Sequence, residues 1–506
     1  MNRRDLITAA LATFVSAQTS ARVQARPRFA TDPFALGVAS GDPSSDGFVL
    51  WTRLVGPALS LLDEKAVAVN WEVAADDAFK SIVRRGASTA IAERAHAVHI
   101  ELHGLEPGRP YWYRFHTGNA VSRIGRTMTA PIAADRFTFA VVSCQHWEQG
   151  WFSGYRDILS SSAQAIVHVG DYIYEESFGH GPLVRSFGAP MPTDLAGYRL
   201  RHALYKTDAH LQEAHAATPW IVTWDDHEVQ NDYAGVHPGD SDDVEHFIPR
   251  RRAAYQAYFE HMPLRPSTFR NGAVQMHRRL RWGDLAMLHV LDARQYRDDQ
   301  PCGTDKEFGG RRIELCDEAR DPRRSMLGAE QEAWLYAGLR DDVAPWSLIL
   351  QQTLFSELNL SDTATPAYWS DIWDGYAANR QRLLDALAVS RAANKVMFGG
   401  DVHSFWAADI KADYAKAESK ILGSEFIGTC IASRNPPRSM FGPVYSSNPH
   451  IHFMDDDRSG YLFVQIERQR LNVDMRMVVD LTNPSSVCTS LRRFGVENGR
   501  AGVQSA

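Results

Sequence analysis

Apolar runs recur along the chain after residue 136 and alternate with stretches of helical periodicity. The runs read FTFAVVS, QAIVHVG, PWIVTW, WSLILQQT and NKVMFGG, and the helical stretches include LAGYRLRHALYKTDAHLQEAHAA. Strands that are apolar throughout are buried on both faces, as in sheets covered by helices. The pattern predicts an α/β core with sheets packed face to face and helices outside. Within it, RRLRWGDLAMLHV predicts a hairpin turning at Gly283 and Asp284.

Residues 33–130 follow a different pattern, in which short strands such as FVLWTRL, VNWEVAAD and HAVHIELHGL are separated by turn residues. Such spacing predicts a small β-sandwich of the fibronectin type III or immunoglobulin-like kind. The LEPG turn at 105–108, which runs into Tyr113, resembles the tyrosine corner of those domains. Because no ionisable groups cluster in this segment, we expect it to be structural or accessory.

The first 25 residues, MNRRDLITAALATFVSAQTSARVQA, contain the three parts of a signal peptide in order. Arg3 and Arg4 precede an apolar segment that is too short to span a bilayer. Adjacent arginines followed by Asp-Leu-Ile predict export by the twin-arginine machinery, which carries folded proteins. The alternative is a disordered tail with chance arginines. We expect a periplasmic or secreted protein without a membrane anchor.

Composition narrows the class of protein. The length of 506 residues favours two or more domains. The formal net charge of −7 argues against a nucleic-acid binder, whose binding surface would be basic.

The five cysteines are informative because exported thiols are usually paired. Cys302 and Cys316 bracket a polar insertion and predict a disulfide. Cys430 and Cys488 lie near the C-terminal strands and form a candidate second pair, although other connectivities stay open. If both pairs form, Cys144 is left without a disulfide partner, and an unpaired cysteine in an exported protein requires an explanation.

Residues of metal-ligand type follow the apolar runs. Cys144 follows FAVVS, Asp171 follows IVHVG, the segment WDDHEVQND follows PWIVT, and Asp401 and His403 follow VMFGG. In an α/β core, ligands collect at the carboxyl ends of strands. We therefore predict a metal site at this edge. Taken singly, each motif has a plainer interpretation as a turn, a helix start, a surface loop or a structural histidine.

The residue types indicate ions of different character. Carboxylates and Asn suit hard cations, whereas thiolate and imidazole suit transition metals. A phenolate such as Tyr174 favours a trivalent ion, and a metal would remove the proton of the Cys144 thiol. No lysine or arginine stands beside the motifs, so we expect cations to offset the carboxylate charge.

The motifs together resemble a known set. SCQ, GDYIYEE, WDDHEVQND and GGDVHS, with LDARQYRD at 291–298, are similar to those of the alkaline phosphatase D family of PhoD-like metallophosphatases and phosphodiesterases. The resemblance runs from Phe34 to the last strands. It implies a signal peptide over 1–25, the N-terminal β-sandwich over 33–130 and a PhoD-like metallophosphatase domain over 136–485. That domain would have a calcineurin-like β-sandwich core flanked by helices.

The resemblance also implies a centre of Fe(III) and Ca(II). The iron would be bound by Cys144, Tyr174 and His403, and Asp171 would bridge the two metals. The calcium side would take its ligands from Asp226, Asn231 and Asp401. Whether Asp226, Asn231 or both reach the metal stays open. His227 would contact the phosphoryl oxygen or protonate the leaving group.

The implied function is an exported metal-dependent phosphoesterase, in which metals lower the pKa of bound water to give a hydroxide or oxide nucleophile. Monoester and diester substrates both stay open. The alternatives are a non-catalytic exported binding protein with structural metals, or a different hydrolase on the same metal scaffold. For Asp292 and Arg294 we expect a salt bridge that braces the site, the alternative being contact with substrate. We expect the arginines at 250–252 to lie on a solvated helix face.

Overall fold

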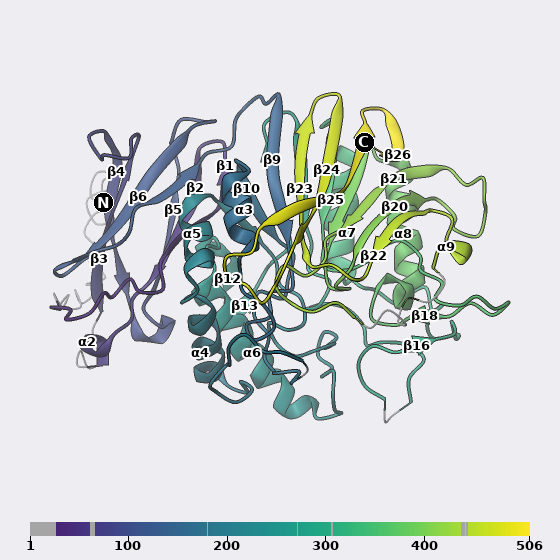
Figure 1. Ribbon diagram of the computed structural model, residues 1–506, viewed down its shortest axis with the longest axis horizontal. Coiled ribbons are helices and arrows are strands. Elements are labelled where there is room, and N and C mark those ends of the chain that lie inside the picture. Colours follow the sequence, from purple (N-terminus) through teal and green to yellow (C-terminus); the bar gives the residue numbers. More distant parts are fainter. Residues whose placement is uncertain are drawn as a thin grey trace, which may run out of the picture.

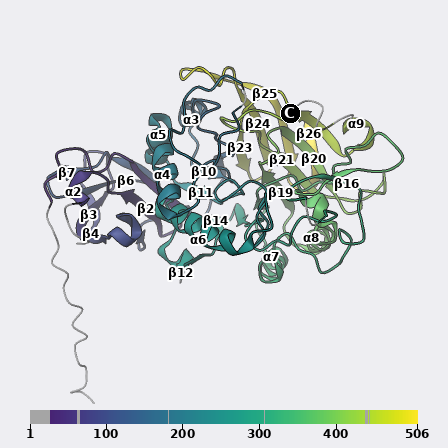
Figure 2. The same cartoon turned by 90° about the horizontal axis from the view of Figure 1, so that it is seen from below.

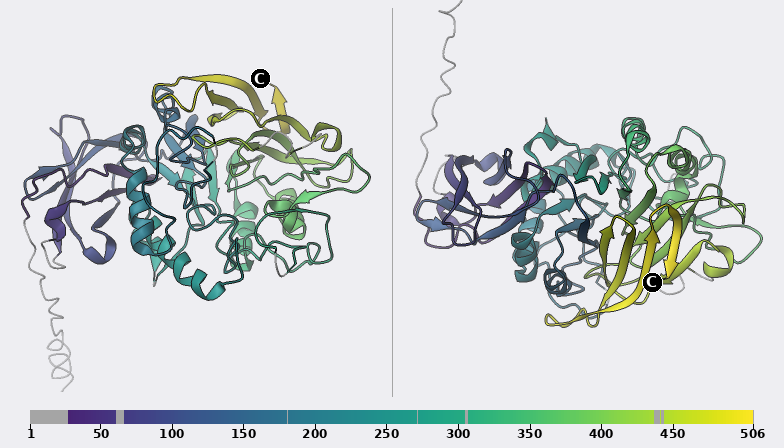
Figure 3. Two further views of the ribbon diagram at one scale, coloured as in Figure 1. Left: turned by 60° about the horizontal axis from the view of Figure 1, so that its bottom comes forward. Right: turned by 90° about the horizontal axis from the view of Figure 1, so that it is seen from above.

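The computed structural model describes residues 27–505 except 61–65, 180, 271, 305–306, 437–440 and 442–443. The predicted signal peptide lies outside the described residues. The N-terminal strands occupy one end of an elongated molecule in every view (Figures 1 and 3). No helix in the described part of the chain is long and apolar enough to cross a membrane.

The larger of the two main sheets has ten strands and carries four neighbouring parallel strands near its centre. Its order is β26 (Arg500–Ser505), β25 (Cys488–Glu497), β24 (Arg470–Val478), β23 (Gly460–Glu467), β9 (Arg136–Val142), β10 (Ala165–His168), β11 (Trp220–Val222), β1 (Val38–Ser44), β2 (Gly47–Arg53) and β5 (Ala97–Leu102). The parallel strands are β9, β10, β11 and β1. The first three are the apolar runs FTFAVVS, QAIVHVG and PWIVTW.

The second main sheet has seven strands and packs face to face on the first. Its order is β14 (Arg278–Trp282), β15 (Ala286–Val290), β17 (Trp346–Leu350), β19 (Asn394–Gly399), β21 (Ile421–Ile427), β20 (Phe405–Lys411) and β22 (Ile451–Asp455). The rings of Phe137 and Trp282 stack across the interface with centroids 4.0 Å apart. The antiparallel pairing of β14 and β15 confirms the predicted hairpin.

Helices cover the outer faces of both sheets, which confirms the predicted α/β class. The outer face of the ten-stranded sheet packs on α3 (Gly154–Ser160), α4 (Leu195–Tyr205), α5 (Ala209–Ala217) and α6 (Val244–His261). The seven-stranded sheet packs on α7 (Ala329–Asp341) and α8 (Ala377–Val389). Figure 2 shows this layering, from the yellow C-terminal strands through the green strands to α7 and α8.

Short elements complete the described chain. They are α2 (Pro57–Ser60), α9 (Val444–Ser447), η1 (Ala92–Arg94), η2 (Pro266–Thr268), η3 (Trp373–Tyr376) and two pairs of two-residue strands, β12 (Phe269–Arg270) with β13 (Ala273–Val274) and β16 (Arg312–Ile313) with β18 (Tyr368–Trp369).

The N-terminal strands form a second, smaller pair of sheets around their own apolar core. One sheet consists of β4 (Ile82–Ala90), β3 (Val67–Ala74), β6 (Pro110–Thr117), β7 (Ala120–Val121) and β8 (Gly125–Met128). The facing strands β1, β2 and β5 also continue the ten-stranded sheet, because β1 pairs with β11. The N-terminal segment therefore shares a sheet with the rest of the chain.

The tyrosine corner is formed by Tyr111, so its predicted assignment to Tyr113 is wrong. The Tyr111 hydroxyl lies 3.0 Å from the Glu106 amide nitrogen, whose hydrogen bond it accepts, and 3.2 Å from the Glu106 carbonyl. Both tyrosines lie on the same face of β6, because alternate strand residues point the same way. Tyr111 is the nearer of the two to the turn.

The cysteines confirm one predicted pair and contradict the other. Cys302 and Cys316 form a disulfide, while Cys430 and Cys488 are free thiols. The Cys430 thiol donates a hydrogen bond to the Ser433 carbonyl at 2.9 Å in the loop after β21. Cys488 begins β25 in the other main sheet, so the two side chains belong to different local structures.

The predicted solvated face for the arginines at 250–252 is wrong for two of the three. Arg250 donates a hydrogen bond to the Tyr198 hydroxyl at 2.8 Å, and Arg251 donates to the Gly235 carbonyl. Arg252 is exposed. These first two side chains connect α6 to α4 and to the loop after β11.

Candidate active site

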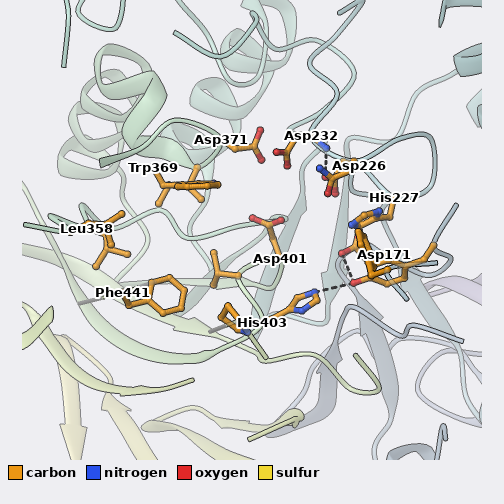
Figure 4. A pocket seen from close by; sticks show the side chains of 17 residues that line it. Asp171, Asp226, His227, Asp232, Leu358, Trp369, Asp371, Asp401, His403 and Phe441 are labelled. Carbon is orange, nitrogen blue, oxygen red and sulfur yellow. Dashed lines mark hydrogen bonds between the residues drawn. The ribbon is translucent and has the colours of Figure 1, made fainter. Parts of the chain in front are cut away.

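A cavity of about 330 Å³ lies where the loops that follow the parallel strands of both sheets meet (Figure 4). Its polar lining includes Asp171, Tyr174, Asp226, His227, Asn231, Asp232, Asp371, Asp401 and His403. Of the seven predicted metal ligands, all but Cys144 line the cavity. Cys144 is buried beside it, with its sulfur within 4.8 Å of ligand atoms of Asp171 and His403.

The loops that follow the strands contain residues with positive φ, a backbone conformation that residues other than glycine rarely adopt. Positive φ angles occur at Cys144 (56°), Asp171 (57°), Asp401 (65°) and His403 (49°). Gly170 makes the approach of neighbouring loops feasible, since a Cβ there would lie 2.3 Å from the Cβ of Asp225. Such strained residues persist where the surrounding structure holds them, and they concentrate at functional sites.

Glu228 holds two of these loops together, and sequence reasoning gave it no role. Its carboxylate accepts hydrogen bonds from the backbone N–H groups of Asp171 at 3.1 Å, Tyr172 at 2.5 Å and Asp225 at 2.8 Å. Burial raises the pKa of Glu228 to about 8, although the backbone hydrogen bonds act to lower it. One side chain thus fixes the loop after β10 against the loop after β11.

Three groups of side chains bring their ligand atoms within 4.8 Å of one another. They are Cys144 with Asp171 and His403, Asp171 with Asp226 and His227, and Asp225 with Asp226 and Asp401. Because neighbouring groups share Asp171 or Asp226, they form one continuous row. The Tyr174 hydroxyl joins the first group, at 3.1 Å from Asp171 Oδ2 and 2.9 Å from His403 Nε2.

The residues present fit a mixed metal centre. One carboxylate oxygen of Asp171 and one of Asp226 are buried without a hydrogen-bond partner among the described residues. Burial raises the pKa values of Asp171, Cys144 and Tyr174 well above their usual ranges, and neighbouring acidic groups add to this. Such groups become anionic at low cost only beside a cation. Thiol, phenol and imidazole at one end and carboxylates at the other suit ions of different softness.

His403 and His227 differ in their surroundings. Burial lowers the pKa of His403 to about 4, and its Nδ1 lies 2.6 Å from the Arg434 carbonyl, so Nε2 is the nitrogen available as a ligand. Burial also disfavours charge on His227, but Glu175 and Asp226 raise the pKa of His227 well above its usual value. Its Nδ1 lies 2.7 Å from Glu175 Oε2.

Arg294 reaches into the row of carboxylates, so the expectation of no arginine beside them is wrong. Its guanidinium contacts Asp225 through Nε, Asp371 at 2.8 Å and Asp401 at 3.4 Å. The sequence places Arg294 in LDARQYRD, far from every other motif, and only the packing of the two sheets brings it into the site. The arginine offsets part of the negative charge.

The predicted salt bridge between Asp292 and Arg294 is also wrong. Asp292 accepts the backbone N–H of Arg294 at 3.1 Å and that of Gln295 at 2.9 Å, so it shapes the turn. Asp371 occupies the place predicted for Asp292 and pairs with both Arg294 and Arg297. No metal-type motif surrounds Asp371 in the sequence, whereas Asp232 and Glu175 lie within motifs that were recognised.

Comparisons with known proteins agree with this site. A family model described as PhoD-like phosphatase matches residues 139–475, and one for the N-terminal domain of such phosphatases matches residues 18–131. Alkaline phosphatase D of Bacillus subtilis (strain 168) is 41% identical over 495 residues, which cover 95% of this chain and 84% of that protein. A solved structure of PhoD is 40% identical with a TM-score of 0.89, covering 95% of this chain and 93% of its own.

The similarity and the cavity together define the class, an enzyme that hydrolyses phosphate ester bonds. The chain belongs to the PhoD-like phosphatase family. This assignment favours an enzyme over the non-catalytic binding protein considered from the sequence.

Proposed function

We propose that the protein is an exported alkaline phosphatase or phosphodiesterase that depends on Fe(III) and Ca(II). The convergence of Cys144, Tyr174 and His403 on Asp171 carries the proposal, because thiolate, phenolate and imidazole together favour iron over calcium or magnesium. In this proposal Asp171, which belongs to two of the three groups, would help to hold both kinds of metal. A calcineurin-like core over 136–485 holds the site, next to a fibronectin type III or immunoglobulin-like sandwich over 33–130.

The calcium side draws on Asp226, Asn231 and Asp401. Asp226 is supported by a buried oxygen, Oδ1, that accepts no hydrogen bond from the described residues and lies 3.6 Å from Arg294 Nη2. The charge of Arg294 keeps the pKa of Asp226 below its usual range despite burial. Asn231 lines the same cavity, and its backbone N–H donates to Glu175 at 2.6 Å, which fixes its loop. We propose that both residues serve the calcium side.

When bound, the metal ions offset charge on the phosphate oxygens and lower the pKa of a bound water. The chain itself supplies a proton donor. Protonated His227, oriented and charged by Glu175, presents its Nε2–H to the cavity, where it stabilises a developing negative charge or protonates the leaving alcohol. Arg294 keeps Asp371 and Asp401 in place around the substrate.

The test is hydrolysis of p-nitrophenyl phosphate and bis(p-nitrophenyl) phosphate by the purified mature protein. Activity should disappear on exhaustive chelation and return with iron and calcium together but not with zinc alone. Full activity after chelation, or restoration by zinc alone, would show that the metal assignment is wrong. The ratio of the two rates decides between monoester and diester preference.

A further inference from the structure

The cavity has two walls of opposite chemistry (Figure 4). Asp171 and His227 lie on one side, and Leu358, Trp369 and Phe441 lie on the other. The apolar wall consists of Leu358, Leu360, Trp369, Ile372, Val402 and Phe441. The substrate's organic group must face one of these walls when its phosphoryl group lies at the charged one.

The apolar wall is the surface of a packed core. Leu358, Leu360, Ile372 and Phe441 are between 1% and 5% exposed. They belong to one apolar cluster with Trp406, whose ring meets that of Phe441 edge-on at 5.2 Å. Because these side chains pack against the cluster behind them, the wall keeps its shape. The side chains of Leu358, Leu360, Ile372 and Phe441 carry no hydrogen-bond donor or acceptor for a hydroxyl group.

Trp369 is held in place by a part of the chain outside this apolar cluster. It lies in β18, which pairs with β16 in the segment closed by the disulfide between Cys302 and Cys316. Gly310 lies against the indole, since a Cβ on Gly310 would be 2.8 Å from Trp369 Nε1. The Gly310 N–H also donates to Asp232 Oδ2 at 2.7 Å, which ties the segment to the charged side.

We propose that the apolar wall binds an uncharged aromatic or branched aliphatic group attached to the ester oxygen of the substrate. The inference rests on the proposed function and adds the substrate class. A polyol or sugar placed there would lose hydrogen bonds to water without replacing them. An apolar group gains by leaving water and packs on the Trp369 ring. The enzyme thus selects apolar phosphate esters over polyol and sugar phosphates.

The experiment compares kcat/KM for benzyl phosphate, cyclohexylmethyl phosphate and glycerol 3-phosphate. All three release primary alcohols, so differences in leaving-group basicity are small. The unaltered enzyme should favour the two apolar esters by about tenfold or more, the discrimination that apolar pockets commonly achieve. A larger preference for benzyl than for cyclohexylmethyl phosphate would assign the contact to the Trp369 face.

Variants locate the effect. Trp369→Ala should reduce the preference for apolar esters by about tenfold, mainly through KM, whereas Trp369→Phe should keep most of it. Trp112→Ala, on β6 in the N-terminal sheets, is the matched control and should leave all three rates unchanged. Circular dichroism checks the fold of each variant. If a variant does not fold, the substrate preference of the unaltered enzyme still tests the inference.

Equal or better turnover of glycerol 3-phosphate by the unaltered enzyme would overturn the inference. The same follows if Trp369→Ala folds and lowers all three rates equally. Failure to hydrolyse any ester with iron and calcium supplied would instead overturn the proposed function.

Discussion

Nδ1 of His227 lies 2.7 Å from the carboxylate of Glu175, inside the cavity wall. Burial disfavours charge on the imidazole, and the neighbouring carboxylates, Glu175 first among them, more than offset this and raise the pKa of His227 well above its usual value. The phenol ring of Tyr174 packs against the imidazole of His227, with the two ring centroids 4.1 Å apart.

Glu175→Gln should impair proton donation by His227. Without the carboxylate charge the pKa of His227 falls, so the alkaline limb of the pH–rate profile should move to lower pH. We expect a loss in kcat of about 100-fold for benzyl phosphate, whose leaving group needs a proton, and a much smaller loss for p-nitrophenyl phosphate. Glu176→Gln is the neighbouring control. Equal losses for both substrates would contradict the donor role.

Glu228→Gln should weaken metal binding. Asp171 and Asp225 donate to one Glu228 oxygen, Oε2, and Tyr172 donates to the other, Oε1. An amide accepts through one oxygen only, so its NH2 group must face at least one of these backbone N–H groups, and the link between the two loops weakens. We expect metal affinity to fall by about tenfold or more, measured as metal retained during graded chelation. Glu425→Gln is matched, because Glu425 is also buried and accepts the N–H groups of Phe355 and Ser356. Equal metal loss in both variants would contradict a specific role of Glu228 in metal binding and would show that it only stabilises the fold.

Removing the disulfide should destabilise the protein and disturb the apolar wall. Replacing Cys302 and Cys316 by Ser should cost about 3 kcal/mol of unfolding free energy in the loop-entropy model, measured by urea unfolding. It should also raise KM for benzyl phosphate, because the closed segment positions Trp369 through β16. Cys488→Ser controls for loss of a thiol. Unchanged stability and KM would contradict both statements.

Replacing Arg3 and Arg4 by Lys should block export. The twin-arginine route reads the arginine pair itself, so the precursor should stay in the cytoplasm with its leader uncleaved. Cell fractionation and the size of the chain on a gel measure this. Normal export of the double Lys variant would point to the general secretory route.

The sequence was informative where the signal is local. Apolar strands and the residues that follow them are adjacent in the chain, so Cys144, Asp171, Asp401 and His403 could be assigned to strand ends. Arg294 and Asp371 could not be found in this way, because the packing of two sheets creates their proximity. The tyrosine corner was displaced by two residues, since both tyrosines fit the same strand face.

Cysteine pairing showed a similar limit. Cys302 and Cys316 are close in the sequence and bracket a polar insertion, and this was enough to predict their disulfide. The candidate pair of Cys430 and Cys488 depended on both lying near C-terminal strands, which says nothing about which sheet each strand joins. Local turn geometry directs the Cys430 thiol to Ser433 instead.

The central claim is that Cys144 binds iron, and the iron content and visible absorption of Cys144→Ser test it most directly. The unaltered protein should contain iron and show a visible charge-transfer band from thiolate and phenolate to Fe(III). Cys144→Ser should fold but lose most iron, the band and most activity, whereas Cys430→Ser, a second buried free thiol, should retain all three. Full iron content and an unchanged band in Cys144→Ser would contradict the account.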